Sequence, residues 1–438
     1  MRDHRRVIIV GGGVAGLVLA RELALGARDV TVLEASDHLG GTVARQTVGG
    51  IELDAGAESF ATRGGTVATL AGALRLRDDI VEPNPEGAWL QPATGPAFRL
   101  PANSLLGIPG SPLASDVVAI IGRRAAWRAF SETLIPGSYA SKAETVGELV
   151  RKRMGSAVLD QLVRPIIRGV HSADADELKV EQVAPGLRSS MVLLGSLGRA
   201  VLDRRHQAER AGSAVAGIRG GIVRLVDELA ADLQRFGVRV ELGGRVSDFA
   251  EDHVIVGGST DVGRRIDGQV VIAAPGLLTP KSGPGHRIVL ATLVVDQPLL
   301  DAAPRGTGVL VAEGASGIRA RALTHSTAKW EWLADRAEGK HVIRLSYDWQ
   351  RDSDEPADVA TVAREDAAAI LGVPLDASQV VDFGRVAWYR PSWETHTPNG
   401  IHAIGESIAG TGLASVIANA TAMAGSLLTD GEGEPGLR

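Results

Sequence analysis

The chain has 438 residues, a formal net charge of −6 and no cysteine. The length exceeds what one hydrophobic core usually supports, so we expect two domains. The lack of cysteine excludes disulfides, thiolate metal sites, iron–sulfur clusters and a cysteine nucleophile, and it agrees with a cytoplasmic location. The net charge argues against a nucleic-acid-binding protein. No apolar run is long enough to predict a membrane-spanning helix.

The first predicted elements are a strand, a glycine loop, a helix and a second strand. "RRVIIV" predicts a buried parallel strand, and Gly11, Gly13 and Gly16 follow with the G-x-G-x-x-G spacing. A helix is expected from Val14 to about Leu25, with its first amides facing a pyrophosphate. "DVTVLEA" predicts a second strand that ends at Glu34, about 20 residues after the loop, where an acid binds ribose hydroxyls. The unit predicts a dinucleotide site without a 2′-phosphate.

The residues after the acid resemble a known family. Gly40 and Gly41 follow Glu34, and the chain returns through an apolar strand to "DAGAESF". The string "EASDHLGG…ELDAGAESF" resembles the flavin-containing amine oxidase and protoporphyrinogen oxidase superfamily. The resemblance implies FAD, with the glycine pair near its ribityl and phosphate groups and Gly56–Ser59 beside the isoalloxazine ring. Where the family often has a basic residue after the glycine pair, this chain has Thr42.

Three later segments resemble the remaining parts of the family's FAD domain. "GIRGGIVRLVDELAADLQRFGVRVELGGRVSDF" predicts a helix and a strand, and its Val246 stands where a backbone receives the adenine. "GQVVIAAPG" predicts a strand that leaves the domain near Ala274. "GIHAIGESIAGTGLASVIANATAMAG" predicts a strand and a helix, with Glu406 expected on a ribityl hydroxyl. The predicted FAD-binding residues are Gly11, Gly13, Val14, Ala15, Gly16, Glu34, Ala35, Gly40, Gly41, Thr42, Gly56, Ala57, Glu58, Ser59, Val246, Ala274, Gly405, Glu406, Gly412 and Leu413, and we expect no metal site.

The intervening chain resembles the porphyrinogen-oxidase branch of that superfamily. Glu144–Leu187 carries apolar residues at helical spacing and matches the branch at Arg153-Met154-Gly155 and at Asp176-Glu177-Leu178. "RGTGVLVAEG" and "HSTAKW" resemble strands of its substrate domain. The predicted fold is α/β: a Rossmann-like FAD-binding domain assembled from discontinuous segments, plus a mixed α+β substrate-binding domain with a helical subdomain. The predicted boundaries are 1–85, 206–276 and 386–438 for the FAD-binding domain, 86–205 for the largely helical substrate part and 277–385 for its sheet.

The resemblance implies an FAD-dependent oxidoreductase that converts a porphyrinogen to a porphyrin in heme biosynthesis. Molecular oxygen is the expected electron acceptor, with hydrogen peroxide as its product. The expected tetrapyrrole is coproporphyrinogen III, with protoporphyrinogen IX as a close variant. Its propionates require a basic clamp, for which Arg63 is the candidate and Arg168 a weaker one. The catalytic side chains stay unassigned, and we expect the scattered histidines to be structural.

Two alternatives and one surface stay open. An amine oxidase or desaturase of secondary metabolism would need an aromatic cage, for which Trp388, Tyr389 and Trp393 are available. A flavin-binding protein without turnover would agree with the short segment before "GIHAIGE", where the family has a further helix. "PLASDVVAIIGRRAAWRAF" has the composition of an interfacial helix, but we expect it to pack against the FAD domain, with at most a weak peripheral membrane contact. The sequence does not fix the oligomeric state.

Overall fold

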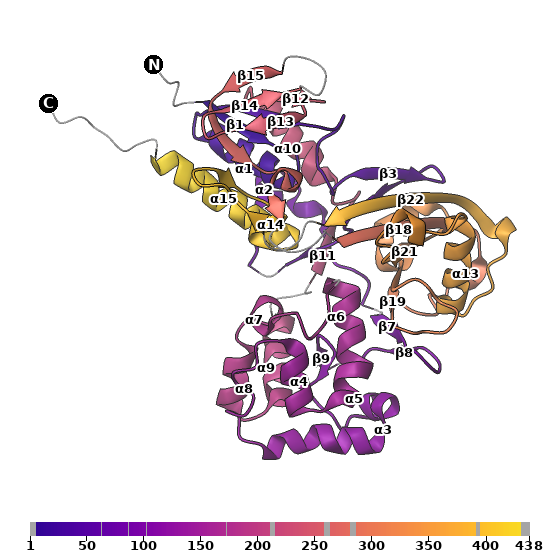
Figure 1. The fold of residues 1–438 in the computed structure, drawn as a ribbon. Helices are drawn as coiled ribbons and strands as arrows, with labels where there is room; N and C mark the ends of the chain where they lie inside the picture. The colour runs from indigo at the N-terminus through magenta and orange to yellow at the C-terminus, as the bar shows by residue number, and fades with distance from the viewer. Residues whose placement is uncertain are drawn as a thin grey trace. The chain divides into compact units, whose positions relative to one another are not determined.

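The computed structural model describes residues 6–62, 64–85, 87–101, 103–171, 173–210, 215–257, 263–280, 286–390 and 395–430. The chain divides into two compact units (Figure 1). The first unit comprises Met1–Pro83, Val215–Arg287 and Trp388–Arg438. The second unit comprises Asn84–Ala214 and Ile288–Ala387.

The first unit is built on a parallel sheet with the strand order β12, β2, β1, β16, β24. The strands are β1 (Arg6–Val10), β2 (Asp29–Glu34), β12 (Arg239–Leu242), β16 (Gln269–Ile272) and β24 (His402–Ala403). Val10 pairs with Leu33 on one side and with Ile272 on the other. The carboxyl ends of β1, β2 and β16 therefore meet at one edge of the sheet, and that edge carries the residues described below.

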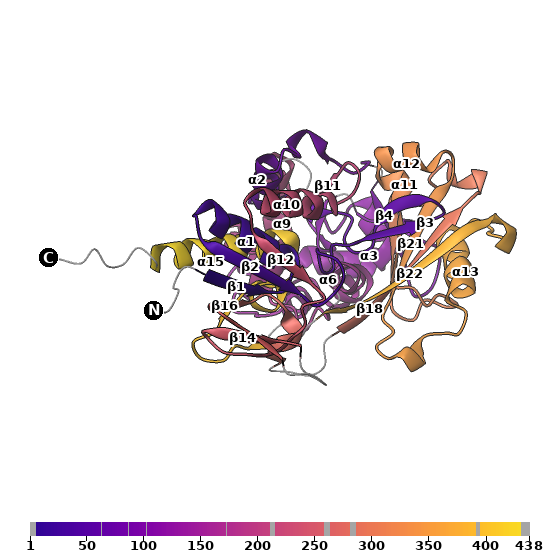
Figure 2. The ribbon, with the colours of Figure 1, turned by 90° about the horizontal axis from the view of Figure 1, so that it is seen from above.

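Both faces of this sheet are covered, which explains why β1 is apolar from Val7 to Val10. Val7 and Ile9 pack in one core with the helices α1 (Val14–Leu25), α10 (Arg224–Arg235) and α15 (Leu413–Asp430). Ile8 and Val10 pack in a second core with the antiparallel strands β13 (Val246–Phe249), β14 (His253–Val256) and β15 (Arg264–Asp267). Figure 2 shows β1 and β2 between α10 and β14.

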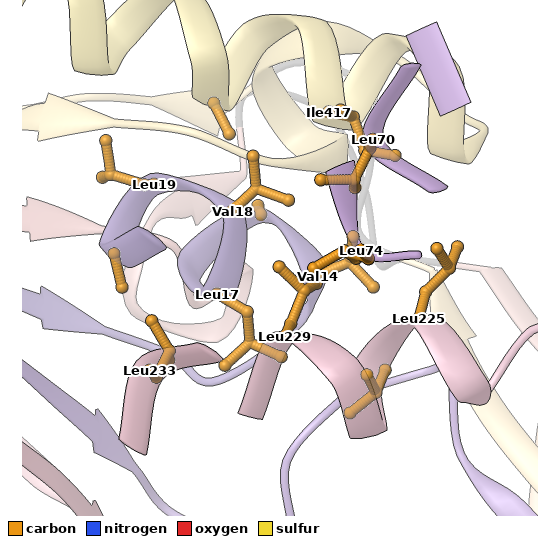
Figure 3. Packing of buried hydrophobic residues seen from close by; sticks show 14 of the residues in the cluster. Val14, Leu17, Val18, Leu19, Leu70, Leu74, Leu225, Leu229, Leu233 and Ile417 are labelled. Carbon is orange, nitrogen blue, oxygen red and sulfur yellow. The ribbon is translucent and has the colours of Figure 1, made fainter. Parts of the chain in front are cut away.

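The helical core of the first unit joins segments that are far apart in the sequence. In Figure 3, Leu17 and Val18 of α1 lie among Leu229 and Leu233 of α10 and Ile417 of α15. Burial of such side chains contributes about 1.5–3 kcal/mol each, so this core holds the three segments together. The remaining elements of the unit are β3 (Arg45–Val48), β4 (Ile51–Asp54), β5 (Phe60–Ala61), α2 (Thr66–Ala73), β6 (Ile80–Val81), β11 (Val215–Ile218), β17 (Thr279–Pro280), β23 (Thr395–His396) and α14 (Glu406–Ala409).

The second unit combines a mixed sheet with a group of helices. The sheet order is β22, β18, β21, β20, β19, β7, β8. Its strands are β7 (Ala88–Gln91), β8 (Phe98–Arg99), β18 (His286–Val295), β19 (Gly308–Val311), β20 (Ala322–His325), β21 (His341–Tyr347) and β22 (Val380–Arg390). The other elements are β9 (Ser104–Leu105), β10 (Ile108–Pro109), α3 (Ser115–Phe130), α4 (Val146–Arg153), α5 (Ser156–Val158), α6 (Arg164–His171), α7 (Val180–Val183), α8 (Leu187–Leu194), α9 (Leu197–Arg210), α11 (Ser326–Lys329), α12 (Glu331–Ala337) and α13 (Val359–Leu371).

A buried ion pair holds the helical part together. The Arg153 guanidinium, 0% exposed, donates to the Glu132 carboxylate and to the carbonyl of Pro136 at 2.9 Å. Glu132 also accepts from the amides of Leu197 and Gly198, each at 3.1 Å, at the start of α9. A buried ion pair is stable only when its remaining donors and acceptors are satisfied, and here they are. The Arg153 match of the sequence therefore marks a structural residue.

The predicted α/β fold class is confirmed, and one local prediction is wrong. "HSTAKW" forms a strand only at His325, because the helix α11 begins at Ser326. The helix α3 packs through Val117, Ile121 and Ala129 into the helical core of its own unit. Its packing against the FAD domain stays a prediction. Within the described ranges, no helix combines the length and the hydropathy that a membrane span requires.

Candidate functional site

The glycine loop continues directly from the central strand. The Gly11 amide donates to the Leu33 carbonyl at 2.8 Å, and the φ of +115° at Gly11 favours glycine. A Cβ at Gly11 would lie 2.9 Å from the Ala274 amide nitrogen, and a Cβ at Gly16 would collide with the Gly11 carbonyl. The first and third glycines therefore serve close packing of loop, strand and helix, as the motif predicts. The structure places Ala274 beside this loop.

The second glycine of the motif faces open space. The nearest atom to a Cβ at Gly13 is the Gly40 carbonyl oxygen at 4.0 Å, and a Cβ at Gly41 would have only Gly13 near it, at 3.4 Å. The Gly40 amide donates to the Gly12 carbonyl at 2.8 Å, and Gly13 bridges Gly40 as in a parallel sheet. The two glycine segments therefore form one cradle. Its open side allows the close backbone approach that a pyrophosphate needs.

Glu34 lies at the end of β2 with its carboxylate against the cradle. One oxygen, Oε2, accepts from the Gly12 amide at 2.7 Å, and Oε1 accepts from the amide and the hydroxyl of Ser36, each at 2.8 Å. A carboxylate offers about four acceptor positions, so capacity remains for a ribose hydroxyl. Ala35 follows Glu34 and is exposed. The binding of a ribose hydroxyl by Glu34 stays a prediction.

The segment that carries Val246 lies beside the end of β2. Val246 is buried and packs in the same core as Leu33. The Gly243 amide donates to the Ser36 carbonyl at 2.8 Å, which fixes the loop between β12 and β13. The predicted adenine position is therefore next to the predicted ribose position, at the β2 side of the sheet edge.

The segment Gly56–Ser59 lies against the glycine pair. A Cβ at Gly56 would collide with the Thr42 carbonyl, so the two segments are in direct backbone contact. The Ala55 carbonyl accepts from the indole nitrogen of Trp388 at 2.9 Å. Ala57 is exposed, whereas Glu58 and Ser59 are half-buried. The structure thus brings the two halves of the predicted "EASDHLGG…ELDAGAESF" element together.

The C-terminal segment completes the edge of the sheet at β24. The Ile404 amide donates to the Ile272 carbonyl at 2.9 Å, and a Cβ at Gly405 would lie 3.7 Å from the Cβ of Ala15. Glu406 begins α14, and Gly412, with a φ of +98°, precedes Leu413 at the start of α15. No atom of the described residues lies within 4 Å of a Cβ built at Gly412. The far end of the chain therefore lies beside Val14 and Ala15, at the start of α1.

The donor set along this edge fits FAD. The Val246 and Gly405 segments lie at opposite sides of the edge, next to β2 and β24, with the cradle between them. The cradle is open where a phosphate requires backbone approach, and a carboxylate with a vacant acceptor position lies next to it. These features suit a dinucleotide such as FAD, which has adenine at one end and a flavin at the other.

Two positioning residues escaped the sequence analysis. The buried Asp54 carboxylate accepts from the amides of Ile222 at 2.9 Å and Val223 at 3.0 Å, just before α10. It fixes α10, whose Val226 lies beside Gly40. The Asn419 side chain accepts from the Gly405 amide at 3.1 Å. In the sequence, Asp54 could have been noticed as a carboxylate at the end of the predicted strand "GIEL". Asn419 could have been noticed only as a polar residue in a largely apolar helix.

The predicted basic clamp has a mixed outcome. Arg63 lies outside the described residues. The Arg168 guanidinium pairs with Asp174 at 2.9 Å and with Glu313, so its charge is already compensated. Arg164 pairs with the same Asp174 at 2.6 Å. Both arginines line a cavity of about 940 Å³ within the second unit.

The second unit also contains a buried chain of histidines. His325 Nε2 lies 3.1 Å from His341 Nδ1, and His341 Nε2 lies 3.1 Å from the Asp301 carboxylate. Burial, together with the neighbouring His341, lowers the pKa of His325 to about 3. Burial lowers the pKa of His341 as well, against the attraction of Asp301. Both rings are therefore neutral at pH 7, which agrees with a structural role.

Comparison with known proteins places the chain in a family. Residues 14–279 match the model of the flavin containing amine oxidoreductase family. The chain is 28% identical to coproporphyrinogen III oxidase of Mycobacterium tuberculosis, over 98% of this chain and 94% of that protein. A presumed protoporphyrinogen oxidase from Exiguobacterium sp. has a similar structure, with a TM-score of 0.79, 20% identity, and coverage of 98% of this chain and all of that one.

Amine oxidases share the same fold at lower similarity. Cyclohexylamine oxidase from Brevibacterium oxydans superimposes with a TM-score of 0.63 and 15% identity, over 98% of this chain and 100% of that one. At these identities the structural likeness concerns the fold alone, whereas the family model covers more than half of the chain. The chain therefore belongs to the flavin containing amine oxidoreductase family and is an FAD-dependent oxidoreductase.

Proposed function

We propose that this protein oxidises a porphyrinogen to the corresponding porphyrin, with coproporphyrinogen III as its substrate. The observation that carries the proposal is the extent of the similarity to the mycobacterial coproporphyrinogen III oxidase. That similarity runs over 98% of the chain, so it includes the second unit as well as the cofactor unit. Because many enzymes share a cofactor unit, similarity outside it is the better guide to the substrate.

FAD, when bound, supplies the acceptor for the hydride that leaves the substrate. The residues of the chain bind and orient the cofactor. The cradle of Gly13 and Gly40 would hold the pyrophosphate, Glu34 would bind the ribose, and the Gly405–Leu413 segment would hold the flavin end. We further propose molecular oxygen as the final acceptor and hydrogen peroxide as the second product. No protein base is required, because pyrrole N–H protons are released to solvent.

A direct assay tests the proposal. The purified protein is mixed in air with coproporphyrinogen III or protoporphyrinogen IX, and porphyrin fluorescence is followed against an enzyme-free control. We expect FAD absorbance in the protein and faster porphyrin formation from coproporphyrinogen III, with peroxide released in parallel. Porphyrin formation at the enzyme-free rate from both substrates contradicts the proposal. Peroxide from amines together with no porphyrin would support the amine oxidase alternative.

The aromatic residues near the flavin end do not by themselves favour the amine oxidase alternative. The Trp388 indole donates to the Ala55 carbonyl, so its ring is held by the backbone of its own unit. Tyr389 is exposed, and Trp393 lies outside the described residues. The amine assay above therefore decides this alternative.

Arg63 is proposed as the clamp for a propionate of the substrate. A guanidinium binds a carboxylate through two parallel hydrogen bonds, which orients as well as attracts it. Arg63→Ala should raise the apparent KM about tenfold and leave the FAD content unchanged. Arg75→Ala is the matched control, because Arg75 is exposed and its ion pairs are long, 3.8 and 3.9 Å. An Arg63→Ala enzyme with the KM of the control rules out the clamp.

We also propose a weak peripheral contact between the second unit and an anionic membrane surface. Four apolar residues near the ends of α3 and α8 are exposed: Trp127 (61%), Phe130 (38%), Leu134 (84%) and Leu193 (85%). The two segments are neighbours, because a Cβ at Gly137 would lie 2.9 Å from the Met191 carbonyl. Large exposed apolar side chains near one another are typical of an interaction surface.

Charge supports a lipid surface as the partner. Arg123, Arg124 and Lys142 are exposed near these residues, and no carboxylate pairs with them in the described part of the chain. Aromatic and basic side chains together favour the headgroup region of an anionic bilayer. The double variant Leu134→Ser/Leu193→Ser should lower co-sedimentation with phosphatidylglycerol-containing vesicles, whereas Leu299→Ser at another exposed site should not. Equal sedimentation with neutral vesicles, or none at all, contradicts the contact.

A further inference from the structure

The segment predicted to bind the flavin end begins at a glycine with a positive φ. Gly405 has φ +104° and ψ −166°, a conformation that residues with a side chain avoid. Its carbonyl accepts from the amides of Ile408 at 3.1 Å and Ala409 at 2.9 Å, which forms the short helix α14. The last hydrogen bond of this segment to the sheet is the one from the Ile404 amide to the Ile272 carbonyl, so the Gly405 amide lies beyond the sheet. The Gly405 amide therefore needs an acceptor from outside its own strand.

Asn419 supplies that acceptor from α15. Its side-chain oxygen accepts from the Gly405 amide at 3.1 Å, across 14 residues of chain. The next residue, Ala420, is fully buried and fills the core position against the rest of the first unit. Asparagine is a poor helix former, so neither helix propensity nor core packing explains it at this position. The hydrogen bond to the Gly405 amide explains why asparagine stands at position 419.

The segment that Asn419 holds contains two glycines in a backbone conformation that side chains disfavour. Gly410 and Gly412 have φ values of +83° and +98°, and in the part of the chain that the structure describes no atom lies within 4 Å of a Cβ built at either. Glycines lose more conformational entropy on ordering than other residues. A fixed point at the start of the segment therefore reduces the entropy that the segment loses when it binds a ligand.

We propose that Asn419 is a positioning residue for FAD: by holding the Gly405 amide, it keeps the Gly405–Leu413 segment in the conformation that binds the flavin end. Asn419 acts through Gly405 and does not itself bind the cofactor. The inference depends on FAD as the cofactor and not on the porphyrinogen proposal. Its test therefore needs no substrate, and its failure leaves the proposed reaction unaffected.

The test compares FAD affinity with the stability of the FAD-free protein. In the full chain, Asn419→Ala should weaken FAD binding about fivefold to tenfold, the equivalent of one lost hydrogen bond. The Tm of the FAD-free protein should fall by less than the affinity loss implies, because the better helix propensity of alanine offsets part of the cost of an unpaired Gly405 amide. Binding is measured by titration with FAD and by the release of flavin fluorescence on dilution of the holoenzyme.

Two further variants separate positioning from a merely structural role. Asn419→Asp keeps an acceptor for the Gly405 amide and should restore most of the affinity. Thr421→Ala alters an exposed residue of the same helix and should leave FAD affinity unchanged. The inference is overturned if Asn419→Ala binds FAD like the wild type. It is also overturned if the loss of affinity comes with a matching fall in the Tm of the FAD-free protein, or if Asn419→Asp fails to restore binding.

Discussion

The Glu34 carboxylate accepts a hydrogen bond from the Gly12 amide at 2.7 Å, so the acid that is expected to bind ribose also fixes the glycine loop. Its other oxygen is occupied by the amide and hydroxyl of Ser36. The cofactor cradle is therefore held in shape by the same side chain that contributes to binding. Preorganisation of this kind lowers the entropy lost on binding.

Replacement of Glu34 should lower FAD affinity. Glu34→Gln removes the charge and places a side-chain amide group against the backbone amides of Gly12 and Ser36. Because a hydrogen bond to a charged group is worth about 1.5–3 kcal/mol, we expect about tenfold weaker FAD binding. Titration of the FAD-free protein measures it. Asp37→Asn is the control, because the Asp37 side chain is exposed and forms an ion pair with His38 at the surface. Equal affinity of the two variants would mean that Glu34 does not contribute to the cofactor site.

Two alanine substitutions in the glycine loop should have different effects. Gly16→Ala brings a Cβ into collision with the Gly11 carbonyl, so the FAD-free protein should lose stability, by about 1–3 kcal/mol. Gly13→Ala meets no atom closer than 4.0 Å, so its FAD-free protein should unfold like the wild type. Gly13→Ala should nevertheless weaken FAD binding, because its methyl group occupies the space that the pyrophosphate needs.

Chemical denaturation and FAD titration of both variants check this pair. The opposite pattern, with Gly13→Ala unstable and Gly16→Ala deficient only in binding, would show that the open side of the cradle is not the cofactor side.

Loss of the buried Glu132 charge should strongly destabilise the second unit. Glu132→Gln leaves the fully buried Arg153 guanidinium without its counter-ion, which we expect to cost about 3–5 kcal/mol. Urea denaturation measures the change. Lys152→Met removes an exposed ion pair with Glu148 and should cost at most about 0.5 kcal/mol. A Glu132→Gln protein as stable as Lys152→Met would contradict the assigned role of the pair.

His325 should make stability depend on pH below neutrality. Its pKa of about 3 in the folded protein lies below its unfolded value of about 6.5, so the unfolded state binds the proton first as pH falls. The neutral ring is fully stabilising above pH 6.5, and this contribution is lost as pH falls toward 3. Between pH 6.5 and 5 the loss amounts to ~2 kcal/mol.

His325→Gln tests this dependence. The glutamine keeps a donor for His341 Nδ1 but does not titrate, so the free energy of unfolding should fall less between pH 6.5 and 5 than in the wild type. His38→Gln, at an exposed histidine, should keep the wild-type slope. If both variants show the wild-type slope, His325 is not the titrating group.

Local patterns predicted the part of the site that is continuous in sequence. The strand β1, the loop with Gly11, Gly13 and Gly16, and the helix α1 from Val14 to Leu25 form as expected. Each of these features depends on residues that are close in sequence. A run of apolar residues forms a strand that is buried on both faces, and glycines stand where two backbones are in contact. "HSTAKW" was predicted as a strand because that expectation rested on resemblance and not on periodicity.

The residues that join distant segments were not predictable in the same way. Asp54 and Asn419 each accept hydrogen bonds from the backbone of another segment, 168 and 14 residues away. Any polar side chain can accept from an amide, so the sequence alone does not show which amide it reaches. Arg168 shows the converse, because its charge suggested a clamp and its neighbours Asp174 and Glu313 already compensate that charge.

The sequence by itself determined the α/β class, the dinucleotide cradle and the acid at the end of β2, because the geometry of a strand–loop–helix unit depends on short-range sterics. The resemblance also predicted that the Gly405–Leu413 segment belongs to the site, and only the tertiary structure decided how that segment and the cradle are held together. It placed Gly405 beside Ala15, Asp54 before α10, and Asn419 under Gly405. These contacts depend on the packing of whole helices and strands into a common core, and that packing is a property of the folded chain.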